Sequence, residues 1–176
     1  FGVGCYSSSD EAPDTLWTRT FGGINDEKGE SVQETVDGGF IIVGHTNSFG
    51  NGSQDVWLIK TDLTGNEEWN QTFGGSSGDY GHAVQQTDDG GYIVLGKTYS
   101  YGNGNDDVWL IKTDSQGNEQ WDQTFGGSSW DLGFAVQQTT DGGYIITGYT
   151  QSYGNGDADV WLIKTDSQGQ EEWNHT

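Results

Sequence analysis

The chain has 176 residues, of which 31% are hydrophobic and 13% aromatic, and it contains 30 glycines and one proline. This length fits one domain, and the composition is typical of short strands joined by glycine turns rather than of helices. The formal net charge of −21 excludes a basic surface for nucleic acid. No apolar stretch approaches the roughly 18 residues that cross a bilayer, so no transmembrane segment is predicted.

Residues 1–16 form a tail that contains the only cysteine, Cys5. A lone cysteine allows no disulfide within the chain. The run Gly2-Val3-Gly4-Cys5, followed by a polar segment, resembles the end of a prokaryotic lipoprotein signal, in which the cysteine becomes lipidated. This resemblance implies a lipid anchor at Cys5 and an extracellular or cell-surface location. The alternative is an incidental cysteine in a disordered tail.

From residue 17 onward the sequence repeats every 52 residues. The copies are 17–68, 69–120 and 121–172, and residues 173–176 are expected to open a fourth. The second and third copies are identical at 39 of 52 positions, which indicates one structural module written repeatedly. Tryptophans recur at two positions of the module and are expected to pack between repeats. They are Trp17, Trp57, Trp69, Trp109, Trp121, Trp161 and Trp173.

Each repeat predicts four strands. In the second copy they cover residues 69–73, 82–87, 92–96 and 108–113, with glycine-rich turns between them. The first alternates large apolar with polar residues, whereas the last two are apolar on both faces, as strands between neighbouring sheets are. The sequence therefore predicts an all-β fold of four-stranded antiparallel blades of the β-propeller type. A β-trefoil, which is also built from three four-stranded repeats, is the alternative.

The turn before each repeating tryptophan resembles a known motif. Residues 113–121, Thr-Asp-Ser-Gln-Gly-Asn-Glu-Gln-Trp, and their counterparts look like the tryptophan-docking motif of quinoprotein-like propellers, and the period is close to that of kelch repeats. More broadly, residues 17–176 resemble repeats of bacterial and archaeal secreted surface proteins. The resemblance implies blades stacked in a ring. Because rings close with roughly four to eight blades, we expect a homo-oligomer or part of a longer chain.

The loop before the last strand of each repeat is a candidate calcium site. Oxygen-bearing side chains alternate there with glycine, and Ca²⁺ takes six to eight oxygen ligands. Turn formation alone also explains these residue types. The candidate ligands are Asn51, Asp55, Asn103, Asn105, Asp107, Asn155, Asp157 and Asp159.

The sequence indicates no catalytic constellation and no cofactor other than calcium. The three histidines, His45, His82 and His175, do not recur at equivalent positions of the repeat. We therefore expect a non-enzymatic scaffold that binds a protein or glycan ligand, or that assembles through open blade edges. The alternatives are a lectin-like module or part of a larger carbohydrate-active or quinoprotein-like enzyme. The aromatic residues available to a lectin are Tyr99, Tyr101 and Tyr153.

Overall fold

A computed structural model describes residues 17–176, and the lipidation candidate Cys5 lies outside the described residues. The described part consists of strands and turns, and within it no helix is long and apolar enough to cross a membrane. The strands are β1 (Glu27–Glu34), β2 (Phe40–Thr46), β3 (Asp55–Thr61), β4 (Glu67–Phe73), β5 (Asp79–Gln86), β6 (Tyr92–Thr98), β7 (Asp107–Thr113), β8 (Glu119–Phe125), β9 (Asp131–Gln138), β10 (Tyr144–Thr150), β11 (Asp159–Thr165) and β12 (Glu171–His175).

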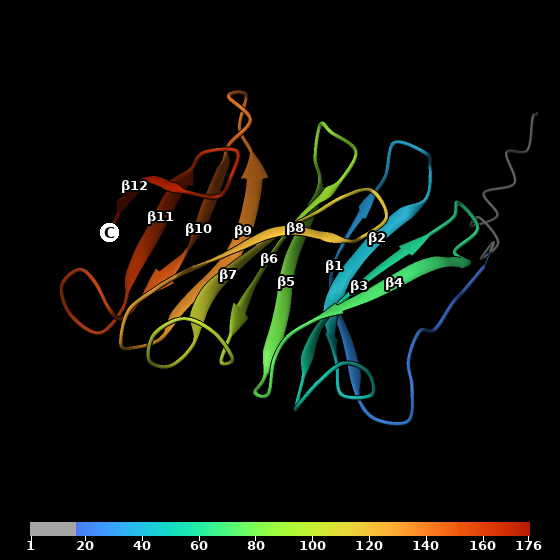
Figure 1. Ribbon diagram of the computed structural model, residues 1–176, viewed down its shortest axis with the longest axis horizontal. Coiled ribbons are helices and arrows are strands. Elements are labelled where there is room, and N and C mark those ends of the chain that lie inside the picture. Colours follow the sequence, from blue (N-terminus) through green and yellow to red (C-terminus); the bar gives the residue numbers. More distant parts are fainter. Residues whose placement is uncertain (1–16) are drawn as a thin grey trace, which may run out of the picture.

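The strands form three four-stranded sheets, in the orders β1-β2-β3-β4, β5-β6-β7-β8 and β9-β10-β11-β12. Neighbouring strands are antiparallel throughout. The sheets stand side by side as an open array in Figure 1. The expected all-β, blade-type fold is thus confirmed. Each sheet is built from four strands that are consecutive in sequence and pair in that order, which excludes the β-trefoil.

Each sheet takes as its last strand the tryptophan segment that follows it in sequence. Trp69 lies in β4, which pairs with β3 of the first sheet. The reason is local: the turn at Asp62–Gly65 closes a tight hairpin, with the Gly65 amide donating to the Asp62 carbonyl at 3.1 Å and a φ of +76° at Gly65. The sheets therefore span 27–73, 79–125 and 131–175, and β12 completes the third sheet.

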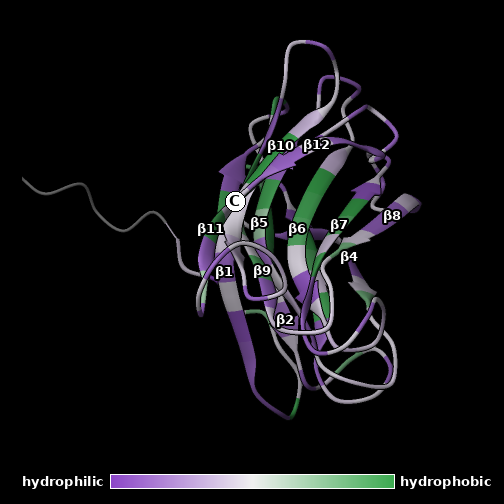
Figure 2. Cartoon of the chain, turned by 90° about the vertical axis from the view of Figure 1, so that its left-hand side faces the viewer, coloured by the Kyte–Doolittle hydropathy of each residue, from purple (hydrophilic) through white to green (hydrophobic). Residues whose placement is uncertain are grey.

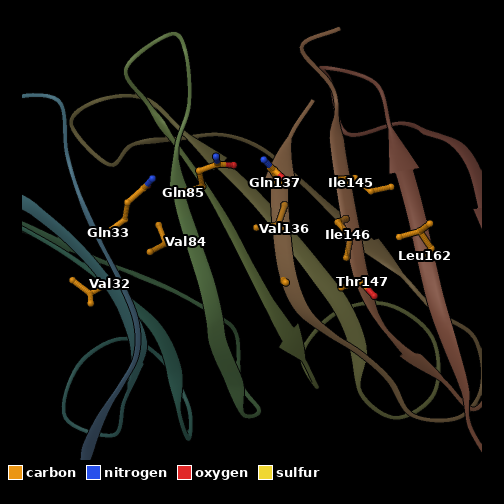
Figure 3. A pocket seen from close by; sticks show the side chains of 11 residues that line it. Val32, Gln33, Val84, Gln85, Val136, Gln137, Ile145, Ile146, Thr147 and Leu162 are labelled. Carbon is orange, nitrogen blue, oxygen red and sulfur yellow. The ribbon is translucent and has the colours of Figure 1, made fainter. Parts of the chain in front are cut away.

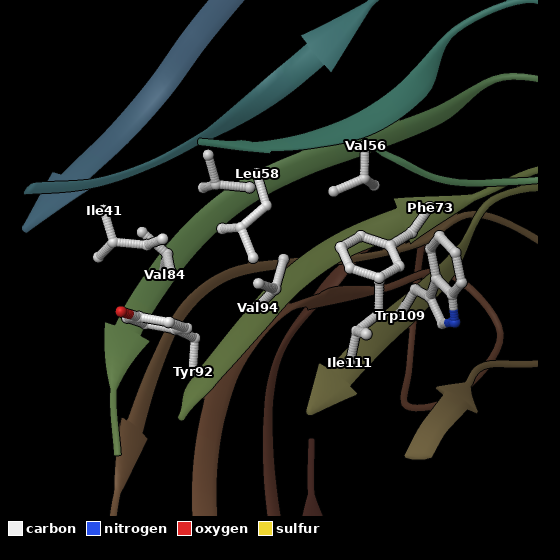
Figure 4. Packing of buried hydrophobic residues seen from close by; sticks show 10 residues of the cluster. Ile41, Val56, Leu58, Phe73, Val84, Tyr92, Val94, Trp109 and Ile111 are labelled. Atoms are coloured by element: carbon white, nitrogen blue, oxygen red, sulfur yellow. The ribbon is translucent and has the colours of Figure 1, made fainter. Parts of the chain in front are cut away.

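Two apolar clusters hold neighbouring sheets together. In the first cluster, Val56 and Leu58 of the first sheet meet Tyr92, Val94 and other residues of the second sheet (Figure 4). The second cluster joins the second and third sheets in the same way. Figure 2 shows the resulting hydrophobic bands along β6 and β7 of the middle sheet, which has a neighbour on each face. This accounts for strands that are apolar on both faces.

The first strands of neighbouring sheets are joined by glutamine side chains. The Gln33 carbonyl oxygen Oε1 accepts the backbone N–H of Gln86 at 2.6 Å, and Gln85 Oε1 accepts that of Gln138 at 2.7 Å. These contacts satisfy N–H groups of β5 and β9 that no neighbouring strand pairs. The same two residues of the repeat thus link β1 to β5 and β5 to β9.

Candidate interaction surface

The repeating tryptophans of the last strands pack on a glycine turn of the following sheet. A Cβ at Gly117 would lie 2.6 Å from the Trp69 ring, and one at Gly169 would lie 2.5 Å from the Trp121 ring. Trp69 and Trp121 also contact Tyr92 and Tyr144, with ring centroids 5.8 Å apart in both pairs. Only glycine leaves room for such close approach.

We expect Gly117→Ala to lower the free energy of unfolding by about 2–3 kcal/mol, because it combines an unfavourable positive φ with overlap against Trp69. Gly90→Ala is the matched control: Gly90 has a φ of +82°, close to the +79° of Gly117, but its Cβ would meet no atom within 4 Å. The control should cost about 1 kcal/mol in urea unfolding. Equal losses of unfolding free energy in the two variants would show that the Trp69 ring moves aside for the added methyl group.

A buried lysine in each sheet forms a cluster that the sequence analysis did not identify. Lys60, Lys112 and Lys164 are 3%, 3% and 7% exposed. Their ammonium groups bind Asp37, Asp89 and Asp141 at 2.9–3.1 Å. The signal was present in the sequence, since the two residues of each pair stand 23 positions apart in every repeat. These clusters lie within single sheets, so their role is structural.

The candidate calcium ligands divide between the surface and the interior. Asp55 and Asp107 are each 1% exposed, and their carboxylates accept the backbone N–H groups of Asn51 and Asn103. The loop residues Asn51, Asn103, Asn105, Asn155 and Asp157 are exposed. Across residues 17–176, no three His, Cys, Asp or Glu side chains are grouped as a metal site requires. The arrangement is that of an aspartate-capped turn.

The tyrosines in the loops before β7 and β11 pack against residues of the sheets. Tyr101 and Tyr153 pack against Trp109 and Trp161 with tilted rings, whose centroids are 5.2 and 5.5 Å apart. Their hydroxyls donate to the carbonyls of Gly74 and Gly126 at 3.0 and 2.8 Å. Tyr99 is 45% exposed and lies beside the Lys97 ammonium.

The histidines make separate contacts. His45 contacts Tyr80 edge-on, with ring centroids 4.9 Å apart. His82 Nδ1 lies 2.9 Å from the Gly133 carbonyl oxygen, and His175 lies beside Trp173. Each histidine therefore belongs to a different packing contact.

One face of the third sheet is an open apolar surface. Val160 is 75% exposed, although the equivalent Val56 and Val108 are 0% and 1% exposed. Around Val160, residues Ile145, Thr147 and Leu162 are also accessible to solvent. We call these four residues the open face. Their equivalents in the first two sheets are covered by the next sheet.

A hollow of about 470 Å³ runs from the open face across the first strands of all three sheets. Figure 3 shows Val136, Ile146 and Leu162 around it, together with the glutamines of β1, β5 and β9. The hollow is apolar near the open face and polar at the glutamines. Trp173, at the end of the same sheet, is 40% exposed and has no following glycine turn within residues 17–176.

The fold and this surface define an all-β repeat protein made of blade-like sheets. No family model matches the chain, and no curated protein matches it. The description of the class therefore rests on the repeats and on the three sheets.

Proposed function

We propose that the chain is a non-enzymatic, extracellular or cell-surface scaffold, and that its open face receives a sheet of the same kind from a second copy. The observation that carries the proposal is the 75% exposure of Val160 at a position that neighbouring sheets cover twice within the chain. The equivalent apolar faces of the first two sheets are each covered by the next sheet of the chain. The open face therefore favours a further sheet of this kind as its partner. The strong acidity and the lipoprotein-like start of the sequence support a location outside the cytoplasm.

The complementary surface is the outer face of the first sheet. There Trp17 lies against Phe40 at a centroid distance of 6.0 Å and against Gly65, as Trp69 does on the second sheet. In an assembly, Trp173 of one copy would replace Trp17 on the other copy. Because one tryptophan replaces another, the exchange costs little free energy beyond that of ordering the strand that carries the incoming Trp173.

The test is the solution mass by light scattering at two concentrations, with and without Ca²⁺. We expect a discrete species of twice 19.1 kDa. Val160→Asp should raise the dissociation constant at least about tenfold, because it places a charge in an apolar interface. Val36→Asp is the control, since Val36 is 92% exposed in the turn between β1 and β2, where its amide donates to Gln86 of the second sheet, away from the open face.

Trp17→Ala should affect self-association in the opposite direction to Val160→Asp. It frees the glycine turn of the first sheet for Trp173, so we expect it to strengthen self-association. A monomer at every concentration, or equal effects of Val160→Asp and Val36→Asp, would contradict assembly through the open face. Glycan turnover by the purified chain would contradict the non-enzymatic proposal.

The resemblance that supports this proposal is to quinoprotein-like, kelch-like and secreted surface propellers. The aspartate-to-glycine turns that precede each repeating tryptophan carry the likeness. Propellers host many functions, so the proposal rests on the surface of this chain and not on the likeness alone.

A further inference from the structure

One end of the three sheets carries side chains that differ from repeat to repeat. β5 begins and β6 ends there, and Tyr80 pairs with Lys97 across these two strands. The equivalent pairs of the first and third sheets are Lys28 with His45 and Leu132 with Tyr149. The strand Asp-Val-Trp-Leu-Ile-Lys-Thr, in contrast, is the same in all three sheets. The sheets therefore do not require particular residues at this end, and a rigid scaffold that holds varied side chains is suited to binding.

Aromatic and polar side chains gather at this end, across the junctions between sheets. We call six of these residues the aromatic rim: Tyr80, His82, Lys97, Tyr99, Trp130 and Phe134. Tyr99, Trp130 and Phe134 are 45%, 45% and 53% exposed. Trp130 directly precedes Asp131, whose amide donates to the Asp106 carbonyl oxygen at 2.8 Å, so Trp130 lies where the third sheet meets the second. The rim thus offers three aromatic side chains to solvent.

Contacts between sheets hold the rings of the rim in place. Tyr80 contacts His45 of the first sheet edge-on, with ring centroids 4.9 Å apart, and its hydroxyl donates to Gln54 Oε1 at 2.9 Å. Phe134 of the third sheet stacks on His82 of the second, with ring centroids 5.9 Å apart. A ligand that binds rings already held in this way causes little further loss of side-chain entropy.

Lys97 supplies the charged group of the rim. Its ammonium group binds Asp106 at 2.9 Å and lies 4.7 and 5.2 Å from the ring centroids of Tyr80 and Tyr99. The Lys97 side chain is 19% exposed, and Asp106 is its one hydrogen-bond acceptor within residues 17–176. An ammonium group has three N–H donors, so two remain for oxygen atoms of a ligand.

These charges favour a neutral ligand. The net charge of −21 repels a polyanion, and the charge of Lys97 is already paired with Asp106. A cationic ligand would compete with Lys97 for the faces of Tyr80 and Tyr99. A neutral sugar ring fits both features of the rim, because its C–H groups can lie on an aromatic face while its hydroxyls form hydrogen bonds around the edge.

We propose that the aromatic rim binds a neutral oligosaccharide, whose sugar rings stack on Trp130, Phe134 and Tyr99 and whose hydroxyls accept hydrogen bonds from Lys97. Of the tyrosines that the sequence offered to a lectin, Tyr99 belongs to this rim, whereas Tyr101 and Tyr153 pack against tryptophans of the sheets. The rim is complete within one copy of the chain, so this inference does not depend on self-association.

The decisive variant is Trp130→Gly, because the equivalent residue of the second sheet is Gly78 and the fold accepts glycine there. Isothermal titration calorimetry with neutral tetrasaccharides of glucose, mannose, galactose or N-acetylglucosamine measures the dissociation constant. At least one of these sugars should bind the unmodified chain with a constant below about 1 mM. Trp130→Gly should raise that constant about tenfold or more. Trp173→Ala is the matched control and should leave the constant unchanged, because Trp173 is 40% exposed but lies in β12, outside the rim.

Tryptophan fluorescence provides a second readout of the same binding. A sugar ring stacked on Trp130 should change the emission of the unmodified chain and of Trp173→Ala, but not that of Trp130→Gly. Failure of all four sugars to bind would overturn the proposal, as would equal dissociation constants for Trp130→Gly and the unmodified chain. Preferential binding of a heparin fragment or of a proline-rich peptide would assign the rim to another class of ligand and would also overturn it.

Discussion

Trp109→Ala should lower the free energy of unfolding by about 3–5 kcal/mol, as large-to-small changes of buried aromatic residues do. Trp109 is 2% exposed and belongs to the cluster between the first and second sheets. Its indole N–H donates to Asp122 at 2.7 Å, and the tilted ring of Tyr101 packs against its ring. The substitution opens a cavity, removes the donor to Asp122 and leaves the Tyr101 ring without its support.

Urea unfolding followed by tryptophan fluorescence and by circular dichroism measures this loss. Trp173→Ala is the control, because Trp173 is 40% exposed and should cost less than about 1 kcal/mol. A loss below about 1 kcal/mol at Trp109 would contradict its packing role. Since the main contacts between sheets in residues 17–176 join neighbouring sheets, the two probes also report whether the three sheets unfold together.

Asp89→Ala should lower the free energy of unfolding by about 2–4 kcal/mol, because it removes the only carboxylate among residues 17–176 that binds the buried Lys112. Lys112 is 3% exposed, and its other acceptors are the Thr113 carbonyl and the Gln120 amide oxygen. Burial opposes ionisation of Asp89, but the Thr87 hydroxyl and Lys112 together lower its pKa to about 2. The Asp89 carboxyl group is therefore ionised at pH 7, where the variants are compared.

The first sheet supplies the control for this prediction. Lys60 binds Glu68 at 2.9 Å in addition to Asp37. Asp37→Ala therefore leaves one carboxylate on the lysine and should cost about 1 kcal/mol. Urea unfolding of both variants at pH 7 measures the difference. Equal losses would mean that solvent, and not the second carboxylate, satisfies the lysine.

The sequence predicted much of the fold because strand signals are local. Alternation, two-sided apolar runs and glycine turns placed the strands, and the regular period predicted equal sheets. The start of β5 was placed at residue 82 instead of Asp79, because a bulge between Gly81 and Ala83 interrupts the alternation. The tryptophan strand was grouped with the repeat that it opens in sequence, whereas its hairpin places it in the preceding sheet.

The candidate site was less predictable, since it depends on which side chains meet across sheets. Asp55 and Asp107 were noted as loop residues that favour calcium or a turn. The fold turns them inward against Asp79 and Asp131, which stand 24 positions further along the chain. The buried lysines were not identified either, because the partner of a lysine in an apolar strand is known only once the turn between the first two strands of the sheet, 23 positions earlier, lies against it.

By itself, the sequence determined the period, the strand class and the positions of the tryptophans. Only the tertiary structure decided what each position does. The segment Asp-Val-Trp-Leu-Ile-Lys-Thr forms β3, β7 and β11 without a single difference, yet it is buried throughout in the first two sheets and partly exposed in the third. The physical reason is that the burial of a residue depends on what packs against it. A following sheet covers the first two copies of this strand, whereas within residues 17–176 no sheet follows the third copy.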